Sequence, residues 1–280
     1  MKPRTRLGSP AFLTLLSGAG QGIHCEILLR MIDEDGSLIL PGTILPAAER
    51  FHMTPRIDRW VLRRVFEWMS RVPGGLGAVD MIAVNLSGQS LGDRAFHRFV
   101  TDLIAQSSCD VGKLCLEVTE TSAITHLHDA AEFVSGMRAL GVRVALDDFG
   151  AGFSTTTRLD WLECDELKID RALVDGLEHS HEQRCVVENL VALAHSHGMT
   201  ALAEGVETEA ALAILCESGC DRAQGFLVAR PLPCGELAAR ARNWQARALE
   251  AATAGERQLS LPGFGITTAW WNQGELDAIA

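Results

Sequence analysis

Positive charge is scarce in this chain, and it contains no long apolar stretch. Its 280 residues include 25 lysines and arginines against 36 aspartates and glutamates, which gives a formal net charge of -11 at pH 7. This balance argues against binding to nucleic-acid polymers or anionic membranes through a basic face. The longest uncharged run, residues 7–25, holds four glycines, a proline and a glutamine, and is therefore too polar for a transmembrane helix.

Cysteine pairs with the spacing of a redox or zinc motif are also missing. The eight cysteines are scattered, none belongs to a CxxC motif, and the closest pair is Cys216 and Cys220. In a chain of this length the pattern indicates reduced thiols in the core. Basic residues precede a short apolar stretch at 11–16, but no convincing small-residue cleavage site follows, so we expect a cytoplasmic protein.

The composition suits a large folded unit. Hydrophobic residues make up 47% of the chain and charged residues 22%, which excludes an intrinsically disordered protein. Length alone suggests two domains, but a single α/β barrel often reaches about 250 residues. No interior linker or internal repeat is visible in the sequence.

Short apolar runs alternate with amphipathic segments through the middle of the sequence. We expect strands over residues 25–31, 81–87, 113–119, 142–148, 166–170, 200–205 and 222–228. We expect helices over residues 57–72, 95–106, 130–139, 182–197, 207–218 and 236–254. In the first of these helices, Asp58 and its charged neighbours are expected on the face away from the core. With a possible strand near 12–16, the alternation predicts an α/β fold, a TIM-like (β/α)8 barrel with an incomplete or altered first strand.

Polar side chains recur where the predicted strands end. Because side chains alternate across a strand, these residues fall on the face opposite the most apolar stripe. In a barrel that face points inward, and the carboxyl ends of the strands surround the active site. The residues that would converge there are Glu26, Asn85, Glu117, Asp147, Asp148 and Glu204, with Lys168 on the same side of its own strand.

Carboxylates gathered in one pocket repel each other and raise each other's pKa values unless cations lie between them. Oxygen ligands without cysteine or histidine suit hard metals such as Mg²⁺ or Mn²⁺. The adjacent Asp147 and Asp148 could bridge two ions about 4 Å apart, an arrangement used for phosphoryl displacement.

Simpler interpretations exist for each single feature. An acidic residue after a strand is often only the N-cap of the next helix, so the joint pattern over six strands is what favours a site. The histidine pairs at 126/128, 179/181 and 195/197 lie outside the strand ends, and residues two apart do not share a helix face. We therefore do not expect metal binding at these histidines.

Seven short motifs follow one another at regular places along residues 24–235. They are Glu26-Ile27-Leu28-Leu29-Arg30, Asn85-Leu86-Ser87, Glu117-Val118-Thr119-Glu120, Asp147-Asp148-Phe149-Gly150-Ala151-Gly152, Leu167-Lys168-Ile169-Asp170, Ala203-Glu204-Gly205-Val206-Glu207, and Gln224-Gly225 with Arg230-Pro231. Together they resemble the EAL domain, the family that hydrolyses the bacterial second messenger cyclic di-GMP. On this resemblance, residues 1–20 would be an N-terminal segment, 21–240 the EAL barrel, and 241–280 the end of a helix and an irregular tail.

The resemblance implies a metal-dependent phosphodiesterase that converts cyclic di-GMP into linear pGpG. It implies two ions, Mg²⁺ or Mn²⁺, the first held by Glu26, Asn85, Glu117 and Asp147, and the second by Asp147, Asp148 and Glu204. Lys168 and Glu204 would position or activate the attacking water. Arg30, Gln224 and Pro231 would contact the substrate or the water, and Glu120 and Glu207 would support the loops. A homodimer is also implied, because the loop after Asp148 lies near a dimer interface in this family.

Departures from the family pattern leave other functions open. Ile27, Ala151 and Phe153 replace an alanine, a threonine and a tyrosine, and the start lacks the usual Gln-Pro-Ile strand. One alternative is an EAL-like receptor that holds cyclic di-GMP, or a partner protein, with weak or absent turnover. Another is a barrel enzyme that uses Mg²⁺ in enolate chemistry.

Overall fold

The parallel strands predicted from the sequence form one curved sheet. The computed structural model describes residues 11–12, 16–17, 23–32, 38–71, 76–77, 79–150, 161–234, 236–237, 239 and 241–242. The seven parallel strands are β3 (Ile23–Ile27), β6 (Val79–Leu86), β7 (Leu114–Thr119), β8 (Arg143–Phe149), β9 (Glu166–Ile169), β10 (Thr200–Ala203) and β11 (Arg222–Ala223). They pair in chain order, as expected when each strand returns through a crossover helix.

A short antiparallel strand stands at the start of this sheet. β2 (Leu16–Ser17) pairs antiparallel with β3. It also contacts β11, the strand at the opposite edge of the sheet. The two ends of the sheet therefore meet, which gives the TIM-like barrel with an altered first strand that the sequence predicts. β1 (Ala11–Phe12) lies outside this sheet and pairs antiparallel with β12 (Leu232–Pro233).

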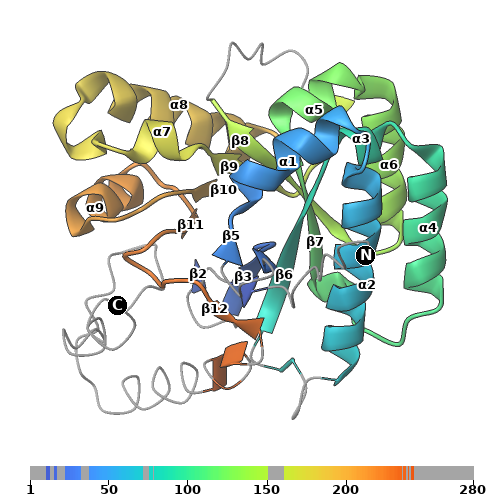
Figure 1. Cartoon of the computed structure of the whole chain (residues 1–280). Helices are drawn as coiled ribbons and strands as arrows, with labels where there is room; N and C mark the ends of the chain where they lie inside the picture. The colour runs from blue at the N-terminus through green and yellow to red at the C-terminus, as the bar shows by residue number, and fades with distance from the viewer. Residues whose placement is uncertain are drawn as a thin grey trace.

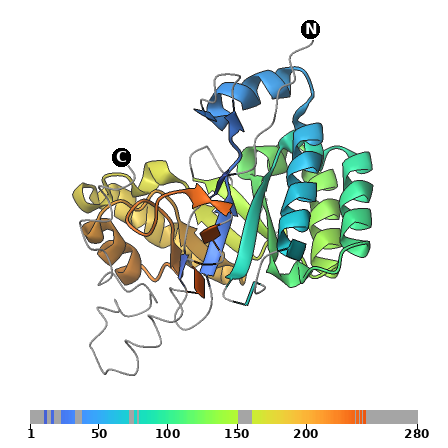
Figure 2. The ribbon, with the colours of Figure 1, turned by 60° about the horizontal axis from the view of Figure 1, so that its bottom comes forward.

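Helices cover the outside of the barrel, except for the first helix, which lies at the barrel mouth (Figures 1 and 2). They are α1 (Pro41–Arg50), α2 (Thr54–Arg71), α3 (Gly88–Leu91), α4 (Arg94–Ala105), α5 (Glu120–Thr125), α6 (Leu127–Ala139), α7 (Arg171–Val174), α8 (His181–Ser196) and α9 (Glu209–Glu217), with 3-10 turns η1 (Val111–Lys113) and η3 (Leu177–His179). The helices predicted from apolar periodicity agree with α2, α4, α6, α8 and α9 to within about three residues at each end. In the predicted helix 236–254, the described residues reach 242 and are helical.

Two predicted strands run four or more residues past the ends of the strands that form. The strand expected over 222–228 ends at Ala223, because the chain turns at Gly225, whose carbonyl accepts hydrogen bonds from the amides of Val228 and Ala229. The strand expected over 25–31 leaves the sheet after Ile27. Its last residue belongs instead to a small hairpin of β4 (Met31–Ile32) and β5 (Leu38–Ile39).

That hairpin and α1 form a lobe that stands off the mouth of the barrel (Figure 2). Leu40 and Phe51, at the two ends of α1, expose 59% and 70% of their surfaces. The described residues do not include the loop positions Ala151, Gly152 and Phe153. They also leave out residues 1–10 of the predicted N-terminal segment 1–20 and residues 243–280 of the predicted tail 241–280.

The barrel has two separate apolar regions. The larger packs the outward face of the strands against the helices, as expected for a parallel sheet covered on its outer side. The smaller consists of Met81, Ala83, Cys115 and Ala145, from three neighbouring strands. These four residues alternate with the outward-facing ones, so they lie inside the barrel, and charged side chains fill the interior on both sides of them. The eight cysteines are free thiols, as the sequence predicts.

Candidate metal and substrate site

Lys168 lies at the centre of the acidic residues predicted from the strand ends. Its side chain is 1% exposed, and its Nζ is 2.7 Å from Glu204 Oε1, 2.9 Å from Glu117 Oε1 and 3.0 Å from Asp147 Oδ1. Glu26 Oε2 lies slightly farther away, at 3.7 Å. Five different strand ends therefore bring four carboxylates and one ammonium group together, as the alternation of side chains predicted.

Glu26 is oriented by two amide side chains from opposite parts of the chain. Asn85 Nδ2 donates to Glu26 Oε1 at 2.6 Å, and Gln224 Nε2 donates to Glu26 Oε2 at 2.5 Å. Both oxygens of this carboxylate are thus held in place by a donor. Asn85 and Gln224 are brought to the centre by the same inward-facing positions that carry the acids.

Asp147, Asp148 and Glu204 form a group with the donor set of a hard cation. One carboxylate oxygen from each lies within 4.8 Å of the others, close enough for a single ion to contact all three. Asp148 has a positive φ of 55°, so the backbone turns sharply after Asp147 and brings both adjacent carboxylates to the mouth. Glu117 Oε2 is buried and has no hydrogen-bond partner among the described residues. A buried carboxylate oxygen without a donor is suited to a metal, so these residues fit a divalent cation.

The pKa values of three acids are raised. Burial, followed by the charges of Glu26 and Asp147 against the opposing effect of Lys168, raises the pKa of Glu117 well above its usual range. Burial and the neighbouring carboxylates also raise the pKa of Glu204 to about 7. Burial and the charge of Asp147 raise the pKa of Asp148 to about 6. Carboxylates with raised pKa values gain most from a cation placed among them.

Lys168 and Glu26 stabilise each other's charged forms. Burial alone would lower the pKa of Lys168, but the carboxylates around it, led by Glu117, raise it well above its usual value. Burial likewise opposes ionisation of Glu26, but the Lys168 charge and the amide donors of Gln224 and Asn85 outweigh it, and its pKa is lowered. Lys168 is therefore an ammonium group at neutral pH, suited to holding negative charge rather than to taking a proton.

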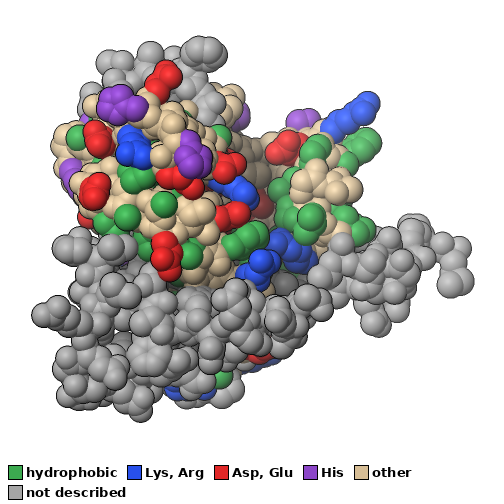
Figure 3. Space-filling view, turned by 90° about the vertical axis from the view of Figure 1, so that its left-hand side faces the viewer, with side chains coloured by type: hydrophobic (Ala, Val, Ile, Leu, Met, Phe, Trp, Pro, Cys, Tyr) green, Lys and Arg blue, Asp and Glu red, His purple; other side chains and the backbone are tan. Residues whose placement is uncertain are grey.

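A cavity of about 370 Å³ opens beside this cluster, between the barrel mouth and the lobe that carries α1. Its lining is mostly apolar and includes Ile27, Leu29, Leu45 and Ile57, and it reaches the acidic centre at Asp147. The space-filling view shows a hollow between the lobe and the barrel body, with charged side chains along its edge (Figure 3). An apolar slot next to a polar reaction centre is the usual form of a small-molecule site.

Asp58 is a site residue that sequence reasoning placed wrongly. The helical period puts it on the polar face of α2, but its side chain is buried and accepts hydrogen bonds from Ser87 N at 2.9 Å, Ser87 Oγ at 2.7 Å and Ser90 Oγ at 2.6 Å. It therefore fixes the turn that follows Asn85 and lines the apolar cavity. Burial raises the pKa of Asp58, against the effect of these donors.

The remaining predicted residues surround the centre at different distances. Glu120 is buried and its Oε2 accepts a long hydrogen bond, 3.5 Å, from the backbone N–H of Gly150, two residues after Asp148. Glu207 is half-exposed and pairs with Arg171 at 2.8 Å. Arg30 Nη1 donates to its neighbour's carbonyl, and neither Arg30 nor the exposed Pro231 lines the cavity beside the cluster. The structure thus leaves these two outside the group it brings together.

A barrel of seven parallel strands and one antiparallel strand, with an acidic, cation-fitting centre at the carboxyl ends of the parallel strands, defines a TIM-like barrel protein of the kind that carries its active site at this face. The model of the EAL domain matches residues 15–231, and the chain belongs to this family. Among the described residues, none of the helices combines the length and apolar character that crossing a membrane requires.

Curated relatives match over most of this chain. A Mycobacterium tuberculosis protein, described as uncharacterized, is 38% identical over 218 residues, which cover 76% of this chain and 34% of that protein. MucR of Pseudomonas aeruginosa, described as a bifunctional diguanylate cyclase/cyclic di-GMP phosphodiesterase, is 36% identical over 225 residues, covering 80% of this chain and 33% of MucR. The chain therefore spans about a third of the length of these relatives.

Solved structures agree with this assignment. The Pseudomonas aeruginosa MucR phosphodiesterase in complex with c-di-GMP superimposes with a TM-score of 0.74 at 34% identity, covering 81% of this chain and 93% of that one. The EAL domain of Mycobacterium smegmatis DcpA gives a TM-score of 0.68 at 29% identity, covering 84% and 97%. The fold described above is the EAL fold.

Proposed function

We propose that this chain hydrolyses cyclic di-GMP to linear pGpG with two divalent cations, Mg²⁺ or Mn²⁺. The observation that carries the proposal is the contact of Lys168 with Glu26, Glu117, Asp147 and Glu204, all within 3.7 Å, beside an apolar cavity. Relatives described as cyclic di-GMP phosphodiesterases support the choice of substrate.

The charge of the centre supports two ions. Five carboxylates, counting Asp148, and one ammonium group leave a formal charge of about -4, and two divalent cations would cancel it. Cyclic di-GMP is itself a dianion, so it could not enter this pocket without cations. In our proposal one ion is held by Glu26, Asn85, Glu117 and Asp147, and the other by Asp147, Asp148 and Glu204. The ions, when bound, would polarise the phosphodiester and lower the pKa of a water molecule.

Different side chains would position the substrate and the attacking water. The apolar cavity is suited to the flat face of a guanine, which places the phosphodiester at the acidic centre. Lys168, a buried cation, would hold negative charge that develops on the phosphate. Lys168 and Glu204, whose side chains lie 2.7 Å apart, would position or activate the attacking water. Gln224, which donates to Glu26, would hold the water or the substrate, and Arg30 and Pro231 would contact the parts of the ligand outside the cavity.

We further propose that Glu120 and Glu207 support the loops at the mouth, in keeping with the Glu120 contact to Gly150 and the Glu207 pair with Arg171. The domain boundaries we propose are residues 21–240 for the EAL barrel, flanked by 1–20 and 241–280. We propose a homodimer that works in the cytoplasm, where cyclic di-GMP is made. Light scattering on the purified chain, with and without ligand, tests the dimer.

The hydrolysis assay tests the main proposal. Purified protein is incubated with cyclic di-GMP and Mg²⁺, Mn²⁺ or a chelator, and the products are separated by chromatography. We expect pGpG in both metals and none with the chelator. Glu26→Gln should abolish product, whereas Asp129→Asn, an acid on the outer face of α6, should leave the rate unchanged.

The other outcomes identify the alternatives. Tight binding of cyclic di-GMP without product would overturn the hydrolase proposal and favour a receptor. No binding of cyclic di-GMP, with turnover of a carboxylic acid in Mg²⁺, would favour enolate chemistry. Equal rates for Glu26→Gln and the unmodified chain would show that the reacting centre lies elsewhere.

A further inference from the structure

A second polar cluster occupies the barrel interior, at the amino ends of the strands. We call the end of the barrel that holds the acidic centre the upper mouth and the opposite end the lower mouth. His24, Glu166 and Arg222 lie two residues before Glu26, Lys168 and Gln224. They therefore face the same interior, but at the lower mouth. Arg143 lies four residues before Asp147, on the same face of β8. The small apolar layer around Ala83 and Cys115 separates these groups from the acidic centre, so they form an independent site.

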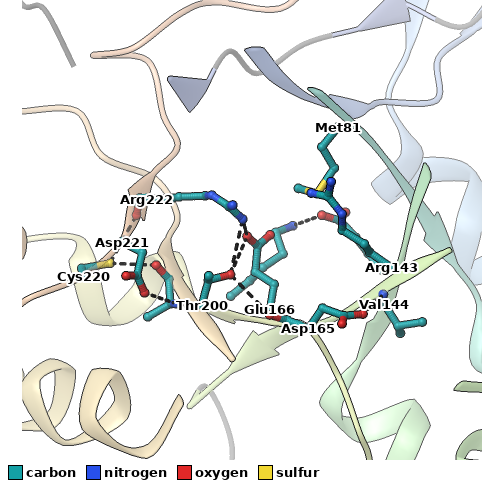
Figure 4. Close-up of polar contacts among 12 residues, drawn as sticks. Met81, Arg143, Val144, Asp165, Glu166, Thr200, Cys220, Asp221 and Arg222 are labelled. Carbon is teal, nitrogen blue, oxygen red and sulfur yellow. Dashed lines mark hydrogen bonds and ion pairs between the residues drawn. The ribbon is translucent and has the colours of Figure 1, made fainter. Parts of the chain in front are cut away.

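This lower mouth contains a cavity. Its volume is about 520 Å³, within the range of small-molecule pockets, and His24, Asp80, Asp110, Lys113, Arg143 and Arg222 line it. Three of these residues are cations, in a chain whose overall charge is -11. Figure 4 shows the side chains of Arg143 and Arg222 reaching towards each other from opposite sides of the barrel, with Glu166 between them.

Within the described part of the chain, the charge of Arg143 has no anionic partner. Arg222 forms an ion pair with Glu166 and donates to Thr200 Oγ1 at 3.3 Å, so its charge is matched. Arg143 Nη1 contacts only the weak acceptor Met81 Sδ, at 3.5 Å, and forms no ion pair with any carboxylate in the described part of the chain. A guanidinium carries five donors in a fixed fork and is seldom left with a thioether as its acceptor.

Two further donors face the same space. Lys113 Nζ donates to the carbonyl groups of Leu76 and Val79, which fixes its position, and it forms no ion pair with any residue that the structure describes. His24 is 5% exposed, and within the described part of the chain its Nδ1 has no hydrogen-bond partner. Burial, followed by the charges of Arg222 and Arg143, lowers the pKa of His24 to about 3, so the ring is neutral. A buried ring nitrogen without a partner needs a ligand or a water to satisfy it.

We propose that this lower mouth binds phosphate, free or as the monoester of a small hydroxylated molecule. The phosphate oxygens would accept from the Arg143 fork and from Lys113, the two cations without an anionic partner among the described residues, and from His24 Nδ1, a buried nitrogen without a hydrogen-bond partner there. Asp80 and the more exposed Asp110 lie in the same lining, where their carboxylates can accept hydrogen bonds from hydroxyl groups such as those of a ribose. The site stands apart from the acidic centre and does not depend on the activity proposed there.

Calorimetric titration of the full chain at constant ionic strength tests the site. Inorganic phosphate and ribose 5-phosphate are titrated separately, with Mg²⁺ and again with a chelator. We expect saturable binding in both conditions and at least a tenfold loss of affinity in Arg143→Met, which keeps the apolar stem. Arg64→Met, on the exposed face of α2, and Asp147→Asn, at the upper mouth, should bind as the unmodified chain does. Tighter binding of ribose 5-phosphate would identify a monoester as the ligand; equal or weaker binding would identify inorganic phosphate.

The position of the ligand is checked without relying on the variants. Nitrogen NMR of the imidazole groups should show the His24 signals moving on phosphate addition, with the same half-saturation as the calorimetry. The proposal is overturned if the unmodified chain shows no saturable phosphate binding. It is equally overturned if binding is lost in Asp147→Asn and kept in Arg143→Met, or if phosphate binds while the His24 signals stay fixed.

Discussion

Replacement of Glu204 by glutamine measures how much the buried charge of this side chain lowers the free energy of unfolding. Glu204 is largely buried, with 17% of its side chain exposed, and its pKa is raised from 4.5 to about 7. Glutamine keeps the shape of the side chain and an oxygen that can accept from Lys168, but it cannot ionise. The comparison of the two proteins therefore reports on the titration of this one group.

The sign and size follow from linkage. A carboxyl group whose pKa is raised on folding binds more protons in the folded protein between pH 4.5 and about 7, so the free energy of unfolding falls as pH rises through this window. At 1.36 kcal/mol per pKa unit the full effect is about 3 kcal/mol. Without metal, we expect the free energy of unfolding of Glu204→Gln to rise by about 2 to 3 kcal/mol relative to that of the unmodified chain as the pH is raised from 5 to 8.

Urea unfolding followed by circular dichroism, in a chelator at several pH values, measures this difference. Glu67→Gln, on the exposed face of α2, serves as the matched control and should give a difference that does not change with pH. Mg²⁺ should remove most of the gain, because cations favour the ionised carboxylate of the unmodified chain. A difference between Glu204→Gln and the unmodified chain that stays constant from pH 5 to pH 8 would refute the reasoning.

Three further predictions concern single residues. Asp147→Asn should lower the rate of cyclic di-GMP hydrolysis at least about 100-fold, because replacing a residue that only supports a metal ligand already lowers activity about 10- to 100-fold. An unchanged rate in the hydrolysis assay would show that Asp147 does not take part in the reaction. Asp58→Ala should lower the free energy of unfolding by about 3 kcal/mol in urea, because Ser87 N–H and the two serine hydroxyl groups lose their buried acceptor; a loss below about 1 kcal/mol would contradict this account. Gly225→Ala should cost about 2 to 3 kcal/mol by the same measurement, because its Cβ would lie 2.2 Å from the Val206 carbonyl oxygen; wild-type stability would show that the two segments can separate freely.

Much of the fold and of the acidic centre could be predicted from the sequence. Apolar periodicity is a local property, and the helices α2, α4, α6, α8 and α9 carry it clearly. The period of two along the strands placed Glu26, Glu117 and Asp147 on the inward face, and the order of a parallel barrel then brings them together. The same reasoning predicted that Glu204 and Lys168 face the centre, because each lies at or near the end of its strand.

The remainder depends on contacts between distant segments. Asp58 falls on the polar side of its helix by period, and its burial is decided by a turn that begins 29 residues later at Ser87. The short β11 results from the close approach of Gly225 to the Val206 backbone, which no local pattern encodes. The lower cluster was not predicted from the sequence. Glu166 and Arg222 do stand two positions before Lys168 and Gln224, but whether two such charges pair depends on strands that the sequence does not place side by side.

The enclosure of Lys168 has a practical consequence. The chain has only three lysines, at positions 2, 113 and 168, and the third exposes 1% of its side chain among acids that keep its amine protonated. An amine-acylating reagent can therefore reach it only when strands at the upper mouth move apart. The rate at which Lys168 becomes acylated, measured by mass spectrometry, would therefore report the rate at which the barrel opens.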